Sequence, residues 1–381
     1  MSNDGRAPGR IHVAHCVHGL GLGGAQKVIA TIVRESDPAA FQHFVYSCDD
    51  GVHGAEVAQA GATVRIIARR LPRFDPTWVA ALASAMRSDA IDVVHTHLFG
   101  DSLHGYLASL VAGRPPVVMT LHNGIDGMTS LQRGGYRWLL ARCARAVACS
   151  GSVERSFASF GGGAFPPLQV ISNGIAFPSQ AEAKPGEAAA LRAELGAREG
   201  ELVLATIGRL VPQKGHRFLF AALAKLGREH GVAARLVVLG DGPIRDELET
   251  QARADGIAEC VLFAGIRLDV LRLLPAIDVV VFSSLYEGLP VALLEGMATG
   301  RCIVSTSCPG IVEAARDERE ALIVPIGDAD GLCEALRRVA TEPGLAARLG
   351  AAAKQRFAGE FTAAQMTRRY EALYRDVLGR A

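Results

Sequence analysis

Two carboxylates, Glu287 and Glu295, stand eight positions apart on either side of a glycine turn. A carboxylate on such a turn and another on the next helix can hold two hydroxyl-bearing parts of one phosphorylated ligand, because carboxylate oxygens accept hydrogen bonds from hydroxyl groups. The alternative is that Glu287 only complements the helix dipole and that Glu295 lies on a solvated helix face. The spacing alone leaves both interpretations open.

The elements around these carboxylates predict a phosphate site. Val279–Phe282 is a short apolar run rich in β-branched residues, which indicates a buried strand. Pro290 suits the first turn of a helix, and Gly300 supplies its end. The unpaired N–H groups at a helix start attract a phosphate. This helix start comprises Gly288, Leu289, Pro290 and Val291.

Two cations, Arg209 and Lys214, precede this region. Arg209 follows an apolar strand that begins at Leu202, and Lys214 stands five residues later, at the entrance to the next helix. Arginine binds an anion as a planar fork and lysine as a point charge, so the two together can clamp a diphosphate. An isolated Arg and Lys would otherwise be ordinary surface residues.

The longest of these runs resembles a known signature. Tyr286 to Ala298 (Tyr-Glu-Gly-Leu-Pro-Val-Ala-Leu-Leu-Glu-Gly-Met-Ala) resembles the E-x7-E motif of the retaining glycosyltransferases of family 4, and Gly208 to Gly215 is similar to that family's diphosphate-binding motif. The resemblance implies an α/β chain with the GT-B fold. This fold consists of two doubly wound, Rossmann-like domains that face each other across a cleft, with a C-terminal helix that crosses back to the first domain.

The resemblance also implies roles for individual residues. It places Glu287 against the hydroxyls of the transferred sugar, Glu295 against the ribose, and Arg209 and Lys214 on the diphosphate. The catalytic group that it implies is Glu287, His122, Arg209 and Lys214. The donor-binding group that it implies is Gly23, Gly24, Gly240, Gly265, Ile266, Gly288, Leu289, Pro290, Val291 and Glu295. The donor is a nucleotide-diphosphate sugar, no further cofactor is required, and no metal ligands are assigned.

A glycine-rich turn follows the first expected strand, Ile11 to Val17. Glycines between a strand and a helix let the backbone approach an anionic ligand closely. One interpretation is a dinucleotide-binding turn, with Asp49 or Asp50 as its acidic residue. The other rests on the resemblance of the run from Gly23 to Val28 to the family's loop beside the donor diphosphate and the acceptor. We favour the second for Gly23 and Gly24.

Polar residues end two further apolar strands of the first half. His95 and His97 end one strand, and His122 and Asn123 follow the next. Ligands of open parallel sheets bind beyond the carboxyl ends of the strands. The family resemblance places His122 at the reacting sugar, and His97, Asn123 and Asn173 at the acceptor or the cleft. The pair of histidines alone suggests a metal, but the spacing supplies no third ligand.

Composition narrows the class of protein. The chain has 381 residues, 49% of them hydrophobic, and a net charge of +1, which argues against a nucleic-acid partner. Its eight cysteines form no C-x-x-C pair, as expected in a reducing compartment. Residues 1–10 show no signal peptide, and no apolar run is long enough to span a membrane. We therefore expect a cytoplasmic protein, with the inner face of the membrane as an alternative place.

A basic helix is expected over residues 131–146, with Arg133, Arg137, Arg142 and Arg145. Such a helix can rest on an anionic membrane surface, or it can be solvated on one side and packed on the other. Peripheral membrane contact through the N-terminal domain is thus one expectation for the partners. A glycan or lipid-linked acceptor is the other.

We expect four segments: an acceptor-binding domain over residues 1–175, a linker over 176–200, a nucleotide-sugar-binding domain over 201–360, and the returning helix over 361–381. The expected function is retaining transfer of a sugar from a UDP-sugar, or a GDP-sugar, to a glycan, lipid-linked or small-molecule acceptor in polysaccharide or glycoconjugate biosynthesis. A nucleotide-sugar epimerase of the same architecture, a glycosidase, a phosphorylase and a non-catalytic nucleotide-sugar-binding subunit are the alternatives. No Asp-x-Asp metal motif accompanies the cations, so fixed positive charge can replace a divalent metal.

Overall fold

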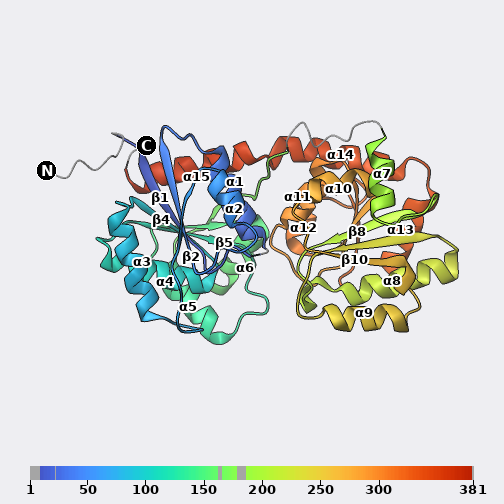
Figure 1. Ribbon diagram of the computed structural model, residues 1–381, viewed down its shortest axis with the longest axis horizontal. Helices are drawn as coiled ribbons and strands as arrows, with labels where there is room; N and C mark the ends of the chain where they lie inside the picture. The colour runs from blue at the N-terminus through green and yellow to red at the C-terminus, as the bar shows by residue number, and fades with distance from the viewer. Residues whose placement is uncertain (1–8, 22, 162–164, 178–185, 380–381) are drawn as a thin grey trace. The chain divides into compact units, whose positions relative to one another are not determined.

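The computed structural model describes residues 9–21, 23–161, 165–177 and 186–379. The chain forms two compact units (Figure 1). The first unit comprises residues 1–174 together with 363–381, and the second unit comprises residues 175–362. Each unit contains one parallel sheet covered by helices, which confirms the predicted pair of doubly wound α/β domains.

The first unit has a seven-stranded parallel sheet in the order β3-β2-β1-β4-β5-β6-β7. Its strands are β1 Ile11–Cys16, β2 Phe41–Ser47, β3 Thr63–Ile66, β4 Val93–His97, β5 Val117–Leu121, β6 Arg145–Ala148 and β7 Gln169–Val170. Its helices are α1 Gly24–Glu35, α2 Gly54–Gln59, α3 Pro76–Ser88, α4 Phe99–Val111, α5 Ser130–Leu140, α6 Gly151–Gly161 and α15 Ala363–Val377. The strand order reverses between β1 and β4, which is where ligands of such sheets bind.

The two faces of this sheet bury different side chains. Successive residues of a strand point to opposite faces. Cys16 and Tyr46 pack with Trp78 of α3 in an apolar cluster on one face. The other face carries His15 and His95 and is covered by α1 and α15, which pack against each other (Figure 1).

The second unit has a six-stranded parallel sheet in the order β10-β9-β8-β11-β12-β13. Its strands are β8 Leu202–Ile207, β9 Ala234–Leu239, β10 Val261–Gly265, β11 Val279–Phe282, β12 Cys302–Thr306 and β13 Leu322–Val324. Its α-helices are α7 Glu187–Glu194, α8 His216–His230, α9 Arg245–Ala254, α10 Val270–Leu273, α11 Val291–Ala298, α12 Pro309–Ala314, α13 Ala329–Thr341 and α14 Leu345–Glu360. Three short 3-10 helices are η2 Pro212–Lys214, η3 Ala258–Cys260 and η4 Leu274–Ala276.

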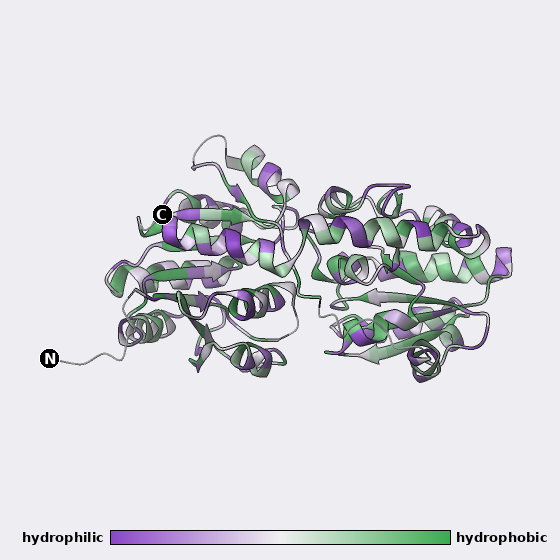
Figure 2. Ribbon diagram, turned by 90° about the horizontal axis from the view of Figure 1, so that it is seen from above, coloured by the Kyte–Doolittle hydropathy of each residue, from purple (hydrophilic) through white to green (hydrophobic). Residues whose placement is uncertain are grey.

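Helices on the outside of both units cover the sheets with one face, whereas no residue of α11 is exposed. Figure 2 shows hydrophilic and hydrophobic residues together on the helices, as expected for amphipathic helices. In the second unit, α8 and α13 pack against each other over a core of aliphatic side chains that includes Leu219, Leu223 and Leu336. None of the helices in the described ranges is both long enough and apolar enough to cross a membrane.

Two boundaries predicted from the sequence are wrong. The expected linker 176–200 contains α7, whose Leu191 is buried and whose Arg192 donates to both oxygens of Asp278 at 3.0 Å. This helix therefore belongs to the second unit; residues 178–185 of the expected linker lie outside the described residues. The expected helix 131–146 ends at Leu140, because the chain then enters β6, so Arg142 and Arg145 are not helical.

Candidate functional site

The stretch from β11 to α11 has the predicted order of strand, turn and helix. β11 has the predicted bounds, and its four residues are buried. α11 begins at Val291, and Pro290 is its N-cap residue with φ −66°, one position before the predicted first turn. The N–H groups at the start of α11 therefore follow directly on the turn that carries Glu287.

Lys214 and Glu287 form an ion pair at this turn. The Lys214 Nζ lies 2.6 Å from Glu287 Oε1, and the two side chains are 19% and 7% exposed. Ser284 Oγ donates to the same carboxylate oxygen at 2.7 Å, and Ser283 Oγ donates to the Lys214 carbonyl at 2.9 Å. The loop after β8 and the loop after β11 are thus joined by a charged contact, which fixes the position of both side chains.

Glu295 and Arg209 differ in exposure. Glu295, on α11, is only 4% exposed, so the interpretation of Glu295 as a solvated surface residue is wrong. Arg209 is exposed, and its side chain makes no hydrogen bond or ion pair with the residues that the structure describes. Its guanidinium is therefore available to an anionic ligand beside the strand end.

Glycines bring the strand ends of the second unit close together. Gly240 has φ 146°, and a Cβ there would lie 1.9 Å from the carbonyl oxygen of Gly208. The Gly240 N–H donates to the Gly265 carbonyl at 2.8 Å, so the predicted residues Gly240 and Gly265 adjoin at the ends of β9 and β10. Ile266, the next predicted residue, is 44% exposed.

Gly310 supports the Glu287 turn and was not among the predicted site residues. A Cβ at Gly310 would lie 1.3 Å from the Gly288 carbonyl oxygen and 2.8 Å from that of Glu287. The backbone of α12 therefore packs directly on the turn. The sequence signal was the glycine after Pro309, where the related family carries two glycines.

We expect Gly310→Ala to lower activity at least tenfold and to destabilise the second unit by about 1–3 kcal/mol, because the new methyl group must displace the Glu287 turn. Turnover and urea denaturation measure the two effects. Gly227→Ala is the matched control, since Gly227 is an exposed residue of α8 and a methyl group added there would have no atom within 4 Å. An active, stable Gly310→Ala protein would contradict the role of this contact.

The predicted histidines of the first unit lie on one face of its sheet. His95 and His97 are fully buried on β4, and His122, after β5, is half-buried. His97 Nδ1 lies 3.1 Å from His122 Nε2. Burial lowers the pKa of His122 to about 4, and burial with the neighbouring His95 lowers the pKa of His97 well below its usual range. These rings are therefore neutral at pH 7.

His15 joins this group and was missed in the sequence. His15 on β1 pairs in register with His95 on β4, and ring nitrogens of His15, His95 and His97 all lie within 4.8 Å of one another. The prediction from spacing that the pair has no third ligand therefore missed His15. His43 on β2 also reaches His15, at 3.0 Å. A signal was present, because His15, His43, His95 and His97 each fall on an apolar strand.

The other predicted residues of the first unit have separate positions. Asn123 is exposed and Asn173 is buried. Gly23 is the N-cap residue of α1 and Gly24 its first residue. Asp49 accepts from the Leu20 N–H at 3.0 Å, so this carboxylate holds the glycine loop itself. That use of Asp49 argues against the dinucleotide-binding interpretation, which needs the acidic residue for a ribose.

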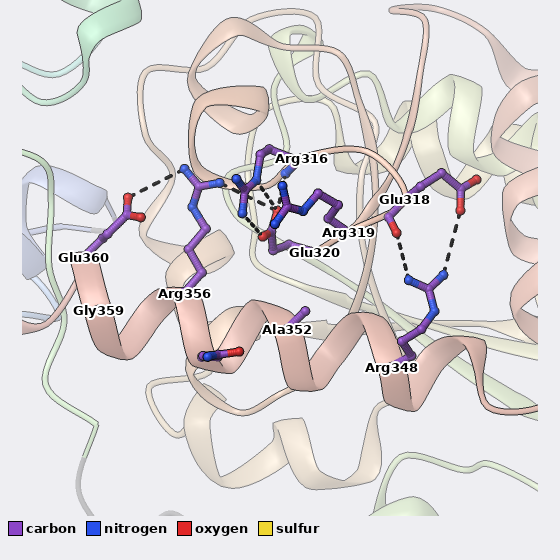
Figure 3. A pocket seen from close by; sticks show the side chains of 10 residues that line it. Arg316, Glu318, Arg319, Glu320, Arg348, Ala352, Arg356, Gly359 and Glu360 are labelled. Atoms are coloured by element: carbon purple, nitrogen blue, oxygen red, sulfur yellow. Dashed lines mark hydrogen bonds and ion pairs between the residues drawn. The ribbon is translucent and has the colours of Figure 1, made fainter.

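A charged pocket of about 500 Å³ lies elsewhere in the second unit, between α14 and the turn at residues 316–320 (Figure 3). Three of its arginines are paired with its carboxylates: Arg316 binds Glu320, Arg348 lies near Glu318, and Arg356 bridges Glu320 and Glu360. None of the predicted donor-binding residues lines it. We therefore do not assign the donor to this pocket.

Comparisons with known proteins agree with these motifs. Residues 22–176 match the description "Glycosyltransferase Family 4", and residues 201–342 match "Glycosyl transferases group 1". The chain is 29% identical over 270 residues to the UDP-Gal:alpha-D-GlcNAc-diphosphoundecaprenol alpha-1,3-galactosyltransferase of Escherichia coli. This match covers 68% of this chain and 69% of that protein. It is 35% identical over 179 residues to the lipopolysaccharide core biosynthesis glycosyltransferase LpsE of Rhizobium meliloti (strain 1021), covering 47% of this chain and 51% of LpsE.

A solved structure extends the likeness to the whole fold. HepE from Anabaena, crystallised in complex with UDP and glucose, matches with a TM-score of 0.86 at 21% identity. The match covers 96% of this chain and 99% of HepE. The two proteins therefore share their fold.

Proposed function

Because this chain belongs to the family 4 (group 1) glycosyltransferases and has the GT-B fold, we propose that it transfers a sugar from a nucleotide-diphosphate sugar with retention of configuration. A UDP-sugar is the favoured donor and a GDP-sugar the alternative. The observation that carries the proposal is the Lys214–Glu287 ion pair beside the start of α11, together with the exposed Arg209 on the loop after β8. Fixed cations and a helix start are the groups that a diphosphate requires.

The donor would be bound along the strand ends of the second unit. Arg209, Lys214 and the N–H groups at the start of α11 hold the diphosphate, and the buried Glu295 holds the ribose. The backbone at Gly265 and Ile266 binds the base. Glu287 holds hydroxyls of the transferred sugar. As the family resemblance implies, we also assign to His122 a hydrogen bond to that sugar. The support for these roles is the position of the residues at strand ends and at the start of α11, and the burial of Glu295 within α11.

The reaction breaks the bond between the anomeric carbon and the diphosphate oxygen and forms a bond from the acceptor oxygen to the same face of that carbon. The acceptor proton passes to the leaving diphosphate. Positive charge and helix-end N–H groups stabilise the negative charge that develops on the leaving group. Lys214 and Arg209 can supply that charge without a divalent metal, so we propose metal-independent transfer.

The test is a panel of UDP-, GDP- and ADP-sugars, with thermal stabilisation and nucleotide release measured in parallel. A ligand at 100 times its Kd stabilises the folded state by about 2.7 kcal/mol. We expect one donor to stabilise the protein and to release its nucleotide. Stabilisation without release would favour a non-catalytic subunit, and conversion to an isomeric nucleotide sugar would favour an epimerase. Failure of every donor to bind would refute the proposal.

We expect Arg209→Gln to weaken UDP binding about tenfold, because a charged hydrogen bond to the diphosphate is lost. Its fold should be unchanged, since Arg209 makes no ion pair within the described part of the second unit. Calorimetric titration with UDP measures the effect. Arg217→Gln is the control, because Arg217 is also exposed but stacks on Phe218 of α8 instead. Equal UDP affinity for Arg209→Gln and the native protein would remove Arg209 from the site.

We also propose a lipid-linked or glycan acceptor, reached at the inner face of the membrane through α5. The name of the Escherichia coli relative includes a diphosphoundecaprenol acceptor. On α5, Leu131 is 83% exposed, Arg137 is exposed, and Trp138 is 38% exposed beneath the guanidinium of Arg142. Exposed apolar and basic side chains on one helix suit an anionic membrane surface.

We expect Leu131→Asp to reduce binding to phosphatidylglycerol vesicles at least fivefold. The leucine side chain would enter the membrane surface, whereas the aspartate is repelled by the anionic lipid. Co-sedimentation measures it, with phosphatidylcholine vesicles as the uncharged control. Equal vesicle binding by Leu131→Asp and the native protein, or no binding by the native protein, would exclude α5 as a membrane-binding surface.

A further inference from the structure

Four histidines of the first unit form one hydrogen-bonded chain. His43 Nδ1 lies 3.0 Å from His15 Nε2, His15 Nδ1 lies 3.3 Å from His97 Nε2, and His97 Nδ1 lies 3.1 Å from His122 Nε2. The rings come from β2, β1, β4 and the loop after β5. Three of the rings are almost fully buried, and only His122 is half-exposed.

The three contacts have the same direction, since each joins Nδ1 of one ring to Nε2 of the next. A neutral imidazole carries one N–H donor and one lone pair. Every contact needs one donor and one acceptor, so the four rings must all carry the proton on the same atom. Either all are protonated at Nδ1 or all are protonated at Nε2.

The buried end of the chain distinguishes these two states. His43 Nε2 is buried and has no hydrogen-bond partner among the described residues. A buried N–H without an acceptor is rarer than an unused lone pair. Burial, together with the positive charge of Arg10, lowers the pKa of His43, so this ring is neutral and carries a single N–H. The lone pair therefore belongs on His43 Nε2 and the proton on Nδ1.

We propose that His43, His15 and His97 are positioning residues that fix His122 as a neutral ring with its N–H on Nδ1. The Nδ1 of His122 has no partner within the described ranges, so this N–H is left for a ligand. His122 then donates a hydrogen bond and cannot accept a proton through Nδ1. The identity of the ligand, an oxygen of the donor sugar, rests on the proposed function, but the tautomer does not.

The residues around the hydrogen-bonded histidines hold these rings in fixed positions. His95 packs on His97, and its Nδ1 and Nε2 lie 2.7 Å from the Tyr374 hydroxyl and 2.8 Å from the Thr120 hydroxyl. All six ring nitrogens of His15, His95 and His97 thus have hydrogen-bond partners, so a metal ion would have to displace them. Burial, and then the neighbouring histidines, lower the pKa values of His15 and His97, and no carboxylate of the described residues contributes to either shift.

The test is the ¹⁵N NMR spectrum of the histidine rings in the full-length protein at pH 7. His104 is an internal reference, because its Nδ1 lies 2.6 Å from the Gly100 carbonyl and its Nε2 accepts from the Asp75 N–H at 3.0 Å. That ring must be the Nδ1–H tautomer. We expect His43, His15, His97 and His122 to give the same pattern as His104. An Nε2–H pattern at His122, or different tautomers along the chain, would overturn the proposal.

Two variants separate positioning from packing. We expect His97→Phe to leave His122 as a mixture of tautomers, and to weaken binding of the donor sugar nucleotide about tenfold while UDP binding is unchanged. His43→Gln is the conservative control, because an amide N–H can still donate to His15 Nε2, so His122 should keep its tautomer. A single Nδ1–H form of His122 in the His97→Phe protein would show that the other histidines do not fix the tautomer of His122. The spectra decide this even if no sugar nucleotide binds.

Discussion

Replacement of Lys214 by methionine is expected to lower kcat for sugar transfer about 10²- to 10³-fold, the effect of removing one group that stabilises transition-state charge. The same variant should lose stability, because Glu287 is 7% exposed and loses its cation at 2.6 Å. Removing one partner of a buried pair costs up to about 3–5 kcal/mol. Single-turnover kinetics and urea denaturation measure the two effects.

The double variant Lys214→Met with Glu287→Gln distinguishes the structural role of the pair from its catalytic role. Stability should return towards the native value, since no uncompensated charge remains and Ser284 Oγ can still donate to the new amide oxygen. Activity should remain low. Lys225→Met is the matched control, because Lys225 is a lysine of α8 paired with the exposed Asp330. Full activity in either Lys214 variant would remove this pair from the proposed mechanism.

The first unit is expected to unfold as the pH falls from 7 to 5, while the second unit keeps its structure. Burial lowers the pKa of His43 to about 3 and those of His15, His95 and His97 well below the ordinary value of 6.5. The unfolded chain therefore binds protons below pH 6.5 that the folded unit does not bind. Each ring then removes about 1.4 kcal/mol of stability per pH unit.

Four such rings approach about 5 kcal/mol per pH unit, compared with a typical total stability of about 5–15 kcal/mol. His122 and His104 of the same unit add to this effect, because burial lowers their pKa values too. Two groups act in the opposite direction: burial raises the pKa of Asp101, and its hydrogen bond raises the pKa of His18, so both favour the folded state in acid. In the second unit, burial lowers the pKa of His216 to about 4, and His230 is exposed. The second unit should therefore lose much less stability than the first unit as the pH falls from 7 to 5.

Hydrogen exchange with mass spectrometry at pH 7, 6 and 5 follows the two units separately. His43→Gln should make the acid loss of the first unit shallower by about 1.4 kcal/mol per pH unit, because one titrating ring is removed. His230→Gln should have no effect. If the two units lost the same stability on acidification, or if neither lost any, the buried histidines would not control stability in acid.

The second unit was the more predictable from sequence, because its longest motif, the Glu287 turn with the start of α11, is continuous in the chain. Glu287 and the start of α11 lie within one turn of each other, and strand and helix signals around them are local. The buried position of Glu295 could not be predicted, because exposure depends on which side of α11 faces the sheet. The contact of Gly310 with Gly288 was also missed, since it depends on how closely α12 approaches the Glu287 turn.

The histidine chain could not be predicted for a related reason. His15 lies 28 positions from His43 and 82 from His97, and only the parallel register of β1, β2 and β4 brings the rings together. A strand pattern predicts burial of alternate side chains, but it does not state which strands are neighbours. The chain order of the strands also differs from their order in the sheet.

The helix α15 determines the order in which the two units can mature during translation. The second unit is one continuous segment, residues 175–362, whereas the first unit needs α15 from the end of the chain. Until Tyr370 and Tyr374 are synthesised, the hydroxyl of Thr120 lacks its contact with Tyr370, and Nδ1 of His95 lacks its contact with Tyr374. N-terminal domains ordinarily fold first. In this protein the second unit can finish folding while the nascent first unit is still incomplete.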